Sequence, residues 1–230
     1  MYLKTLRLEN FKCYPGSISL NFSPGITAII GHKGTGKSSI LDALRWVLGQ
    51  QQLSERCGRD GGDLIYNGRE LHSLADFAHV DIVIDNADCS ISQMRATEIA
   101  ITRNCHRNGS ETVYINDNAL SPDDIAAPLC SSIQSKFCFW SRDNFDPAMF
   151  RQIVAERKTT VHVLDNVDSI LGKSARSELA ENVKQAAIHT QFIVVPHYNS
   201  MMKIADTIYG ITVDTHGARR LLTVDGMTMT

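Results

Sequence analysis

The sequence predicts an α/β fold in which a mostly parallel core sheet is combined with an antiparallel β-subdomain. Three short apolar runs have the length and the β-branched composition of buried strands, at 26–30, 161–165 and 192–195. Helical periodicity follows the first run, over residues 39–48. Residues 1–22 and parts of 80–117 instead alternate apolar and polar side chains, as strands with one solvated face do.

The connection between the first strand and the helix is rich in glycine. It reads Gly31, His32, Lys33, Gly34, Thr35, Gly36, Lys37 and Ser38, which fits G-x-x-x-x-G-K-[ST] without a mismatch. Glycines allow positive φ angles, so successive N–H groups can turn inward around a phosphate chain, and the helix N-terminus favours an anion. The segment therefore predicts a nucleoside triphosphate site. Lys37 would reach the β- and γ-phosphates, Ser38 would hold Mg²⁺, and Ser39 completes the expected nucleotide-binding set.

The composition is that of an ordinary globular protein. The chain has 230 residues, of which 43% are hydrophobic and 21% charged. Its net charge of −2 gives no general attraction for nucleic acid, so DNA binding would require a local basic patch. Six cysteines without a C-x-x-C pair favour reduced thiols over disulfides or a zinc site. No apolar run approaches ~20 residues, so we expect an intracellular soluble protein without a membrane partner.

Segments on both sides of the glycine loop carry a specific pattern. They are Leu6–Tyr14 (LRLENFKCY), Phe22–Gly31 (FSPGITAIIG) and Leu41–Gly49 (LDALRWVLG). Together with the loop they closely resemble the N-terminal head lobe of the structural maintenance of chromosomes (SMC) ATPases, which belong to the ABC class. The resemblance continues more loosely. It implies that Arg56 or Arg59 faces nucleotide or DNA, although either residue can also be a solvated surface charge.

The resemblance recovers after residue 159. Val161–Asp165 is an apolar run that ends in an acid, the Walker B pattern, which implies that Asp165 holds Mg²⁺ beside Ser38. The plainer alternative is a strand-end aspartate that caps the next turn. Another apolar run leads to His197, which resembles the family's switch histidine and would contact the γ-phosphate. Its alternative is an ordinary strand-end histidine.

Several positions linked to hydrolysis differ from the family pattern. Asn166 stands where the family has a general-base glutamate, and an amide has no basic lone pair that can accept the proton of water. The family's signature opens a helix and clamps the γ-phosphate held by a partner head. Counting back from Asp165 puts it at 137–142 (FCFWSR), an aromatic cluster expected to be core or partner surface. Gly172 stands where the family has the aspartate of its D-loop. Gln134 is the candidate for the Q-loop glutamine, or else a surface residue.

The resemblance covers about 1–120 and 159–225. It implies one SMC-like head with an N-terminal lobe (about 1–136) and a C-terminal lobe (about 137–230). We expect no coiled coil or hinge, because no sustained heptads occur. It also implies ATP and Mg²⁺ as cofactors. The implied partners are a second head in a homo- or heterodimer, a kleisin-like subunit and, by analogy alone, DNA.

The motifs for nucleotide binding are retained, whereas those for hydrolysis are altered. We therefore expect a head that binds Mg-ATP with weak or no hydrolysis and serves chromosome organisation or DNA repair, in a nucleus or a bacterial nucleoid. Two alternatives remain open at this point. One is an active ATPase completed by a partner, and the other is a structural pseudo-ATPase domain that binds no nucleotide.

Overall fold

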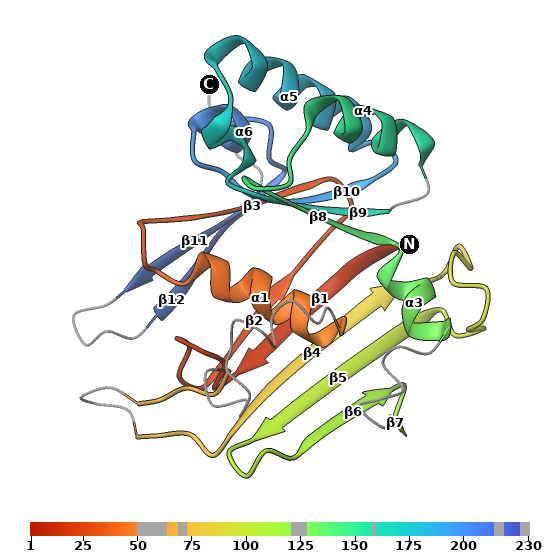
Figure 1. Ribbon diagram of the computed structural model, residues 1–230, viewed down its shortest axis with the longest axis vertical. Helices are drawn as coiled ribbons and strands as arrows, with labels where there is room; N and C mark the ends of the chain where they lie inside the picture. The colour runs from red at the N-terminus through yellow and green to blue at the C-terminus, as the bar shows by residue number, and fades with distance from the viewer. Residues whose placement is uncertain (50–63, 69–72, 121–127, 158–159, 214–218, 226–230) are drawn as a thin grey trace.

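The computed structural model describes residues 1–49, 64–68, 73–120, 128–157, 160–213 and 219–225. Over these ranges the chain forms two six-stranded sheets, with helices between and above them (Figure 1). Arg56 and Arg59 lie outside the described residues. Within the described ranges, no helix is long and apolar enough to cross a lipid bilayer.

One sheet is antiparallel and has the strand order β2-β1-β4-β5-β6-β7. Its strands are β1 (Tyr2–Glu9), β2 (Ser17–Asn21), β4 (Phe77–Asp85), β5 (Glu98–His106), β6 (Glu111–Ile115) and β7 (Asn118–Leu120). Buried and half-buried residues alternate strictly along β4, because one face of this sheet packs on the core while the other meets solvent. The predicted antiparallel β-subdomain is confirmed.

The other sheet is mostly parallel and has the order β12-β11-β3-β10-β9-β8, with only β12 antiparallel to its neighbour. Its strands are β3 (Ile26–Gly31), β8 (Phe137–Ser141), β9 (Val161–Asp165), β10 (Gln191–Val195), β11 (Thr207–Val213) and β12 (Arg219–Asp225). Every residue of β10 is buried, as expected for a central strand that is covered on both faces. The three predicted core strands are thus confirmed.

Helix α1 (Lys37–Val47) lies between the two sheets (Figure 1). Six of its eleven residues are buried, and one core cluster joins α1 to residues of both sheets. A second cluster lies on the opposite face of the parallel sheet. It is covered by α4 (Pro147–Glu156), α5 (Lys173–Ala186) and α6 (Asn199–Met202), while α3 (Pro128–Gln134) lies beside the antiparallel sheet.

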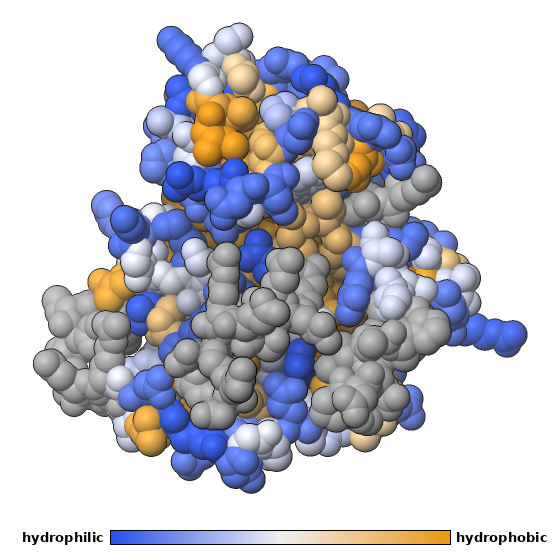
Figure 2. Space-filling model, viewed as in Figure 1, coloured by the Kyte–Doolittle hydropathy of each residue, from blue (hydrophilic) through white to orange (hydrophobic). Residues whose placement is uncertain are grey.

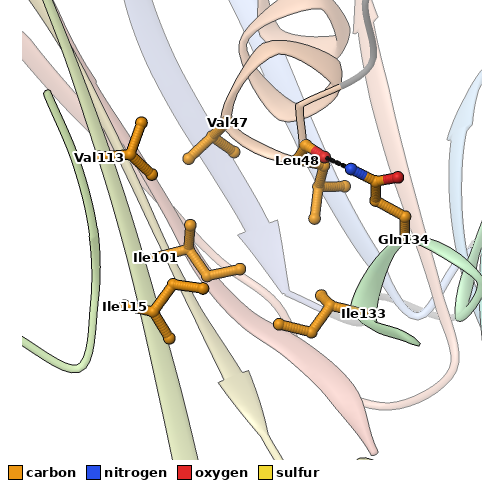
Figure 3. A pocket seen from close by; sticks show the side chains of 7 residues that line it. All are labelled: Val47, Leu48, Ile101, Val113, Ile115, Ile133 and Gln134. Carbon is orange, nitrogen blue, oxygen red and sulfur yellow. Dashed lines mark hydrogen bonds between the residues drawn. The ribbon is translucent and has the colours of Figure 1, made fainter. Parts of the chain in front are cut away.

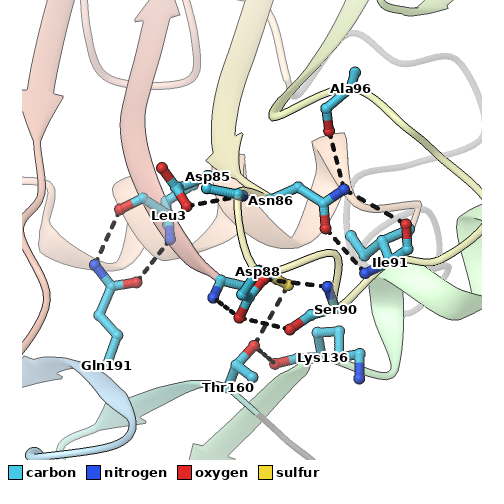
Figure 4. A network of polar contacts seen from close by, with 12 residues as sticks. Leu3, Asp85, Asn86, Asp88, Ser90, Ile91, Ala96, Lys136, Thr160 and Gln191 are labelled. Carbon is cyan, nitrogen blue, oxygen red and sulfur yellow. Dashed lines mark hydrogen bonds and ion pairs between the residues drawn. The ribbon is translucent and has the colours of Figure 1, made fainter.

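Gln191, the first residue of β10, links the two sheets directly (Figure 4). Its Oε1 accepts a hydrogen bond from the Leu3 amide at 2.9 Å. Its Nε2 donates to the carbonyl oxygens of Leu3 and Ser23, both at 3.0 Å. Gln191 is buried, so these bonds satisfy backbone groups that would otherwise be costly to bury.

The segment that takes the place of the signature is a strand of the parallel sheet. Residues 137–141 form the core strand β8, in which Phe137 and Trp140 are buried, as expected for a core cluster. The helix that follows begins at Pro147, with Asp146 as its N-cap.

Candidate nucleotide-binding site

The glycine loop, Asp165 and His197 meet at one edge of the parallel sheet. Strand β10 pairs in parallel with β3 on one side and with β9 on the other. The loop leaves the end of β3, Asp165 is the last residue of β9, and His197 follows β10 by two residues. Because the carboxyl ends of parallel strands face the same way, this edge is where such folds bind ligands.

Two loop glycines are required by space as well as by backbone conformation. Gly31 has a φ of +155°, and a Cβ there would lie 2.6 Å from the Ile211 carbonyl oxygen. Gly36 has a φ of +109°, and its Cβ would lie 2.8 Å from both Cys13 Sγ and the Tyr14 hydroxyl. Both distances are shorter than real Cβ contacts, so the backbone of the loop packs directly on the turn at residues 13–14 and on β11.

Side chains from distant parts of the chain hold the loop. Arg219 of β12 donates from Nε to the Thr35 carbonyl oxygen at 3.1 Å and from its Nη1 to the Cys13 carbonyl oxygen. The Tyr14 hydroxyl donates to the Gly36 carbonyl oxygen at 3.1 Å. No local pattern points to Arg219, because its contact with the loop spans 184 residues.

Lys37 is folded over the loop that it follows. Its ammonium group donates to the carbonyl oxygens of Gly31 at 2.7 Å and His32 at 2.9 Å. Burial lowers the pKa of Lys37, and attraction to the Asp165 carboxylate opposes that shift. His32, Lys33, Gly34 and Ser38 are exposed, whereas the Ser39 hydroxyl accepts a hydrogen bond from Cys13 Sγ at 3.2 Å.

Asp165 is half-buried between charged neighbours. Burial raises the pKa of this carboxyl, while a hydrogen bond from Asn166 and the nearby Arg45 and Lys37 oppose the shift. The Asn166 Nδ2 donates to Asp165 Oδ1 at 2.7 Å. Asn166 adopts a left-handed backbone with a φ of +52°, so its side chain turns back to the acid.

His197 is exposed, and its backbone is held by the buried side chain of Asp168. Its N–H donates to both carboxylate oxygens of Asp168, at 3.0 Å each. The Tyr198 N–H donates to the same carboxylate at 2.7 Å. Asp168 is 1% exposed. Asp168 matches an aspartate of the family pattern three residues after Asp165, but the sequence alone did not predict a role for it.

Gln134 does not reach this edge, which corrects the prediction that it senses Mg²⁺ and the γ-phosphate. Its Nε2 donates to the carbonyl oxygen of Leu48 at 2.6 Å, at the end of α1 opposite to the glycine loop (Figure 3). The narrow pocket beside it, about 10 Å³, has room for one water at most. It is lined by Val47, Leu48, Ile101, Val113, Ile115, Ile133 and Gln134. Gln134 satisfies an unpaired carbonyl at the C-terminus of the helix instead.

The residues at the edge fit a magnesium-bound triphosphate. The loop supplies glycine backbone and an ammonium group, Ser38 supplies a hydroxyl, and Asp165 a carboxylate. Among the described residues, no group of three or more His, Cys, Asp or Glu side chains is placed to hold a metal ion alone. Mg²⁺ is usually held by one or two protein groups together with phosphate oxygens and waters.

Comparison with protein families and curated proteins gives consistent matches. Residues 2–220 match the family described as RecF/RecN/SMC N terminal domain. The chain is 37% identical over 132 residues to the chromosome partition protein Smc of Mycobacterium tuberculosis, a match that covers 57% of this chain and 11% of that protein. It is 38% identical over 117 residues to the Smc protein of Fusobacterium nucleatum, covering 51% and 10%. The matched region thus spans about a tenth of the length of these relatives.

Solved structures show the same fold. The SmcHead bound to the C-winged helix domain of ScpA superposes with a TM-score of 0.82 at 19% identity, covering 98% of each chain. The SMC head domain from Thermotoga maritima gives a TM-score of 0.72 at 22% identity, covering 98% of this chain and all of that one. At these identities the likeness speaks for the architecture of the two sheets and their helices.

Proposed function

The chain belongs to the RecF/RecN/SMC N-terminal domain family and is an SMC-type ABC ATPase head, and on that premise we propose that it binds Mg-ATP but hydrolyses it weakly or not at all. The observation that carries the proposal is the sheet edge itself. The glycine loop, Lys37, Asp165 and His197 lie together there, whereas the residue after Asp165 is an asparagine.

Each retained residue has a defined role in binding. The loop N–H groups and Lys37 would hold the phosphate chain, Ser38 and Asp165 would hold Mg²⁺, and His197 would contact the terminal phosphate. When bound, the ion neutralises negative charge on the phosphates. The carbonyl oxygens of Gly31 and His32 keep the Lys37 ammonium at the loop beforehand, so little rearrangement is required.

The hydrolytic machinery is where this chain is weak. The Asn166 amide is engaged with Asp165 Oδ1 and has no basic lone pair for a water proton. The loss of a general base typically costs ~10²–10⁴-fold in rate. Gln134 is occupied at the far end of α1, and Gly172, the N-cap of α5, offers no side chain.

The same edge supports engagement with a second head. Met149, Ile170 and Tyr198 are 53%, 46% and 41% exposed, and all three follow carboxyl ends of parallel strands. Figure 2 shows hydrophobic surface over the layer of α4, α5 and α6. Met149 lies in α4, and Tyr198 directly precedes α6. Contiguous apolar surface favours a partner. We propose ATP-dependent pairing with another SMC-type head, with a kleisin-like subunit as a further partner.

The biological setting follows from the relatives. Chromosome partition proteins support a role in chromosome organisation, and a DNA repair role is the related alternative. DNA contact would have to be local, since the net charge is −2. A chromosome-associated location in a nucleus or a nucleoid is part of this proposal.

Binding and turnover measured on the purified chain separate the three functions. We expect Mg-ATP to raise the melting temperature. At a ligand concentration 100 times the Kd, the free energy of unfolding should increase by ~2.7 kcal/mol, and Lys37→Ala should show no increase. Steady-state turnover should stay far below one per second. Turnover near one per second that disappears in Lys37→Ala would instead support an active ATPase. Absence of any thermal shift would support a domain that binds no nucleotide.

The general-base position has its own test. Asn166→Glu restores a carboxylate, so we expect turnover to rise by ~10-fold or more if the base is what limits hydrolysis. Asn166→Gln is the matched control, because it has the length of glutamate without the basic group. Equal turnover in the two variants would show that the altered signature or a missing partner is limiting instead.

A further inference from the structure

A buried carboxylate joins the two loops that leave β9 and β10. Asp168 is 1% exposed, and its oxygens accept three hydrogen bonds from the backbone amides of His197 and Tyr198, at 2.7–3.0 Å. A buried charge is costly unless its oxygens are well hydrogen-bonded. Among the described residues, these donors all come from the loop that carries His197, so the carboxylate of Asp168 holds that loop.

Further bonds make the two loops one unit. The Asn166 N–H donates to the Val195 carbonyl oxygen at 2.9 Å. The Ser169 hydroxyl donates to the Asn166 carbonyl oxygen at 2.6 Å. Pro196, between Val195 and His197, has a fixed φ and no N–H of its own. The backbone that carries His197 therefore has little freedom to move independently of the Walker B loop.

The imidazole ring of His197 has one aromatic neighbour among the described residues. The Tyr198 ring meets it edge to face, with centroids 4.8 Å apart and planes at 83°. The guanidinium group of Arg176, in α5, lies 3.7 Å from the centroid of the Tyr198 ring. Such a contact between a cation and a ring is attractive. A continuous chain of contacts thus runs from α5 through Tyr198 to His197.

His197 lies between the glycine loop and Asp165 in the order of the strands. Strand β10 lies between β3, which ends in the glycine loop, and β9, which ends in Asp165. A histidine that leaves the end of β10 stands between the two groups that would hold the triphosphate and its metal ion. It would therefore lie near the phosphate chain, and its contact with the last phosphate, the part that distinguishes ATP from ADP, is part of the function proposed above.

We infer that Asp168 and Tyr198 are positioning residues that hold His197 to discriminate ATP from ADP, with Arg176 linking this discrimination to α5. The inference rests on the proposed function, because it requires nucleotide binding at the glycine loop. In this proposal neither Asp168 nor Tyr198 contacts the nucleotide. Asp168 acts through the backbone of His197, and Tyr198 acts through its ring.

A double-mutant cycle tests this. Titration calorimetry with a non-hydrolysable ATP analogue and with ADP gives an affinity ratio for wild type, His197→Ala, Asp168→Asn and the double variant. The Asp168→Asn substitution replaces one accepting oxygen by an NH₂ group that cannot accept from a backbone N–H, so we expect its ratio to fall ~10-fold, as for His197→Ala. The double variant should lose no more than His197→Ala alone, because Asp168 acts only through His197. Additive losses, or equal losses for both nucleotides, would overturn the inference.

Surface variants keep the test independent of core stability. Tyr198 is 41% exposed, so Tyr198→Ala leaves the core closed; we expect it to lower the ratio severalfold and Tyr198→Phe to preserve it. Asp206→Asn is an exposed control for the loss of a carboxylate that accepts a backbone N–H. The Asp206 carboxylate also accepts a backbone N–H, from Ile26 at 2.8 Å, but at the opposite end of β3. Its ratio should equal that of wild type.

The outcomes separate this inference from the function beneath it. If wild type binds neither nucleotide, both fail. If wild type prefers the ATP analogue and His197→Ala removes the preference, but Asp168→Asn and Tyr198→Ala retain it, only the positioning role is overturned.

Discussion

Folding favours the neutral form of Asp165, whereas the proposed metal site requires the ionised form. Burial raises the pKa of its carboxyl, which means that the ionised form, which the proposed Mg²⁺ site requires, is held at a cost in stability at neutral pH. Residues that serve a ligand often carry such a cost. The Asn166 amide relieves part of it through its bond at 2.7 Å.

Replacing this charge should therefore stabilise the free protein. We expect Asp165→Asn to raise stability at pH 7 by up to about 1 kcal/mol, ~2–4 °C in Tm, while abolishing the extra stabilisation that Mg²⁺ adds to ATP. Since the pKa is raised in the folded state, the difference from wild type should shrink as pH falls through that pKa. Thermal melts at pH 7 and at pH 4 measure this, and a variant less stable at both would contradict it.

His162, in the middle of β9, is buried without a charge partner among the described residues. Burial lowers its pKa from 6.5 to about 4. Its Nδ1 accepts from Trp140 Nε1 at 3.2 Å, whereas Nε2 has no partner in the described part of the chain. The ring stacks on Phe192, with centroids 5.3 Å apart. The neutral form is therefore the one that the folded protein accommodates.

This histidine should make the protein sensitive to acid. Its contribution is complete above pH 6.5, and we expect it to fall by about 3 kcal/mol as pH drops to 4, because the unfolded chain then binds the proton that the folded chain excludes. Urea denaturation from pH 7 to 4 measures the loss. In His162→Phe the unfolding free energy should depend less on pH. His189 is exposed, so His189→Gln should keep the pH dependence of wild type. Identical slopes in all three would refute the assignment.

At the scale of an element, the glycine loop separates two reasons for requiring glycine: a positive φ angle and a lack of room for a Cβ. Gly34 and Gly36 have similar φ values, +86° and +109°. A Cβ at Gly34 would meet nothing within 4 Å, but at Gly36 it would meet Cys13 Sγ and the Tyr14 hydroxyl at 2.8 Å. The two positions therefore form a matched pair.

Alanine at the two glycines should give different losses. We expect Gly34→Ala to cost ~1–2 kcal/mol from the left-handed backbone alone. Gly36→Ala should cost ~1–3 kcal/mol more, because Tyr14 is buried and has no room to withdraw. Urea denaturation without nucleotide compares the two directly. Equal losses would mean that the turn at residues 13–14 yields easily.

Elements defined by local pattern could be predicted from the sequence, and long-range contacts could not. The apolar runs and the glycine loop set the strands of the core sheet and the strand–loop–helix order, because periodicity and φ preference act over a few residues. Arg219 and Asp168 escaped notice because their partners lie 184 and 29 residues away. Gln134 was misplaced since a single glutamine carries no pattern, and the end of α1 supplied a closer acceptor.

At the scale of the whole molecule, the two sheets share one core and one buried polar link. Helix α1 packs against both sheets within a single cluster, and Gln191 ties β10 to Leu3 and Ser23. Each backbone group left unsatisfied by removal of the glutamine would cost ~1–3 kcal/mol. The sheets should therefore unfold together.

The two tryptophans allow this to be observed. Trp46 lies in the core cluster around α1, and Trp140 in the cluster beneath α4 and α5. With Trp46→Phe and Trp140→Phe, fluorescence reports one core at a time, and we expect both to give the same urea midpoint. Adding Gln191→Leu should lower both midpoints together, by about 3 kcal/mol or more in unfolding free energy. If the Trp140 signal were lost at a lower urea concentration than the Trp46 signal, the parallel sheet would unfold on its own, and the link through Gln191 would not couple the sheets.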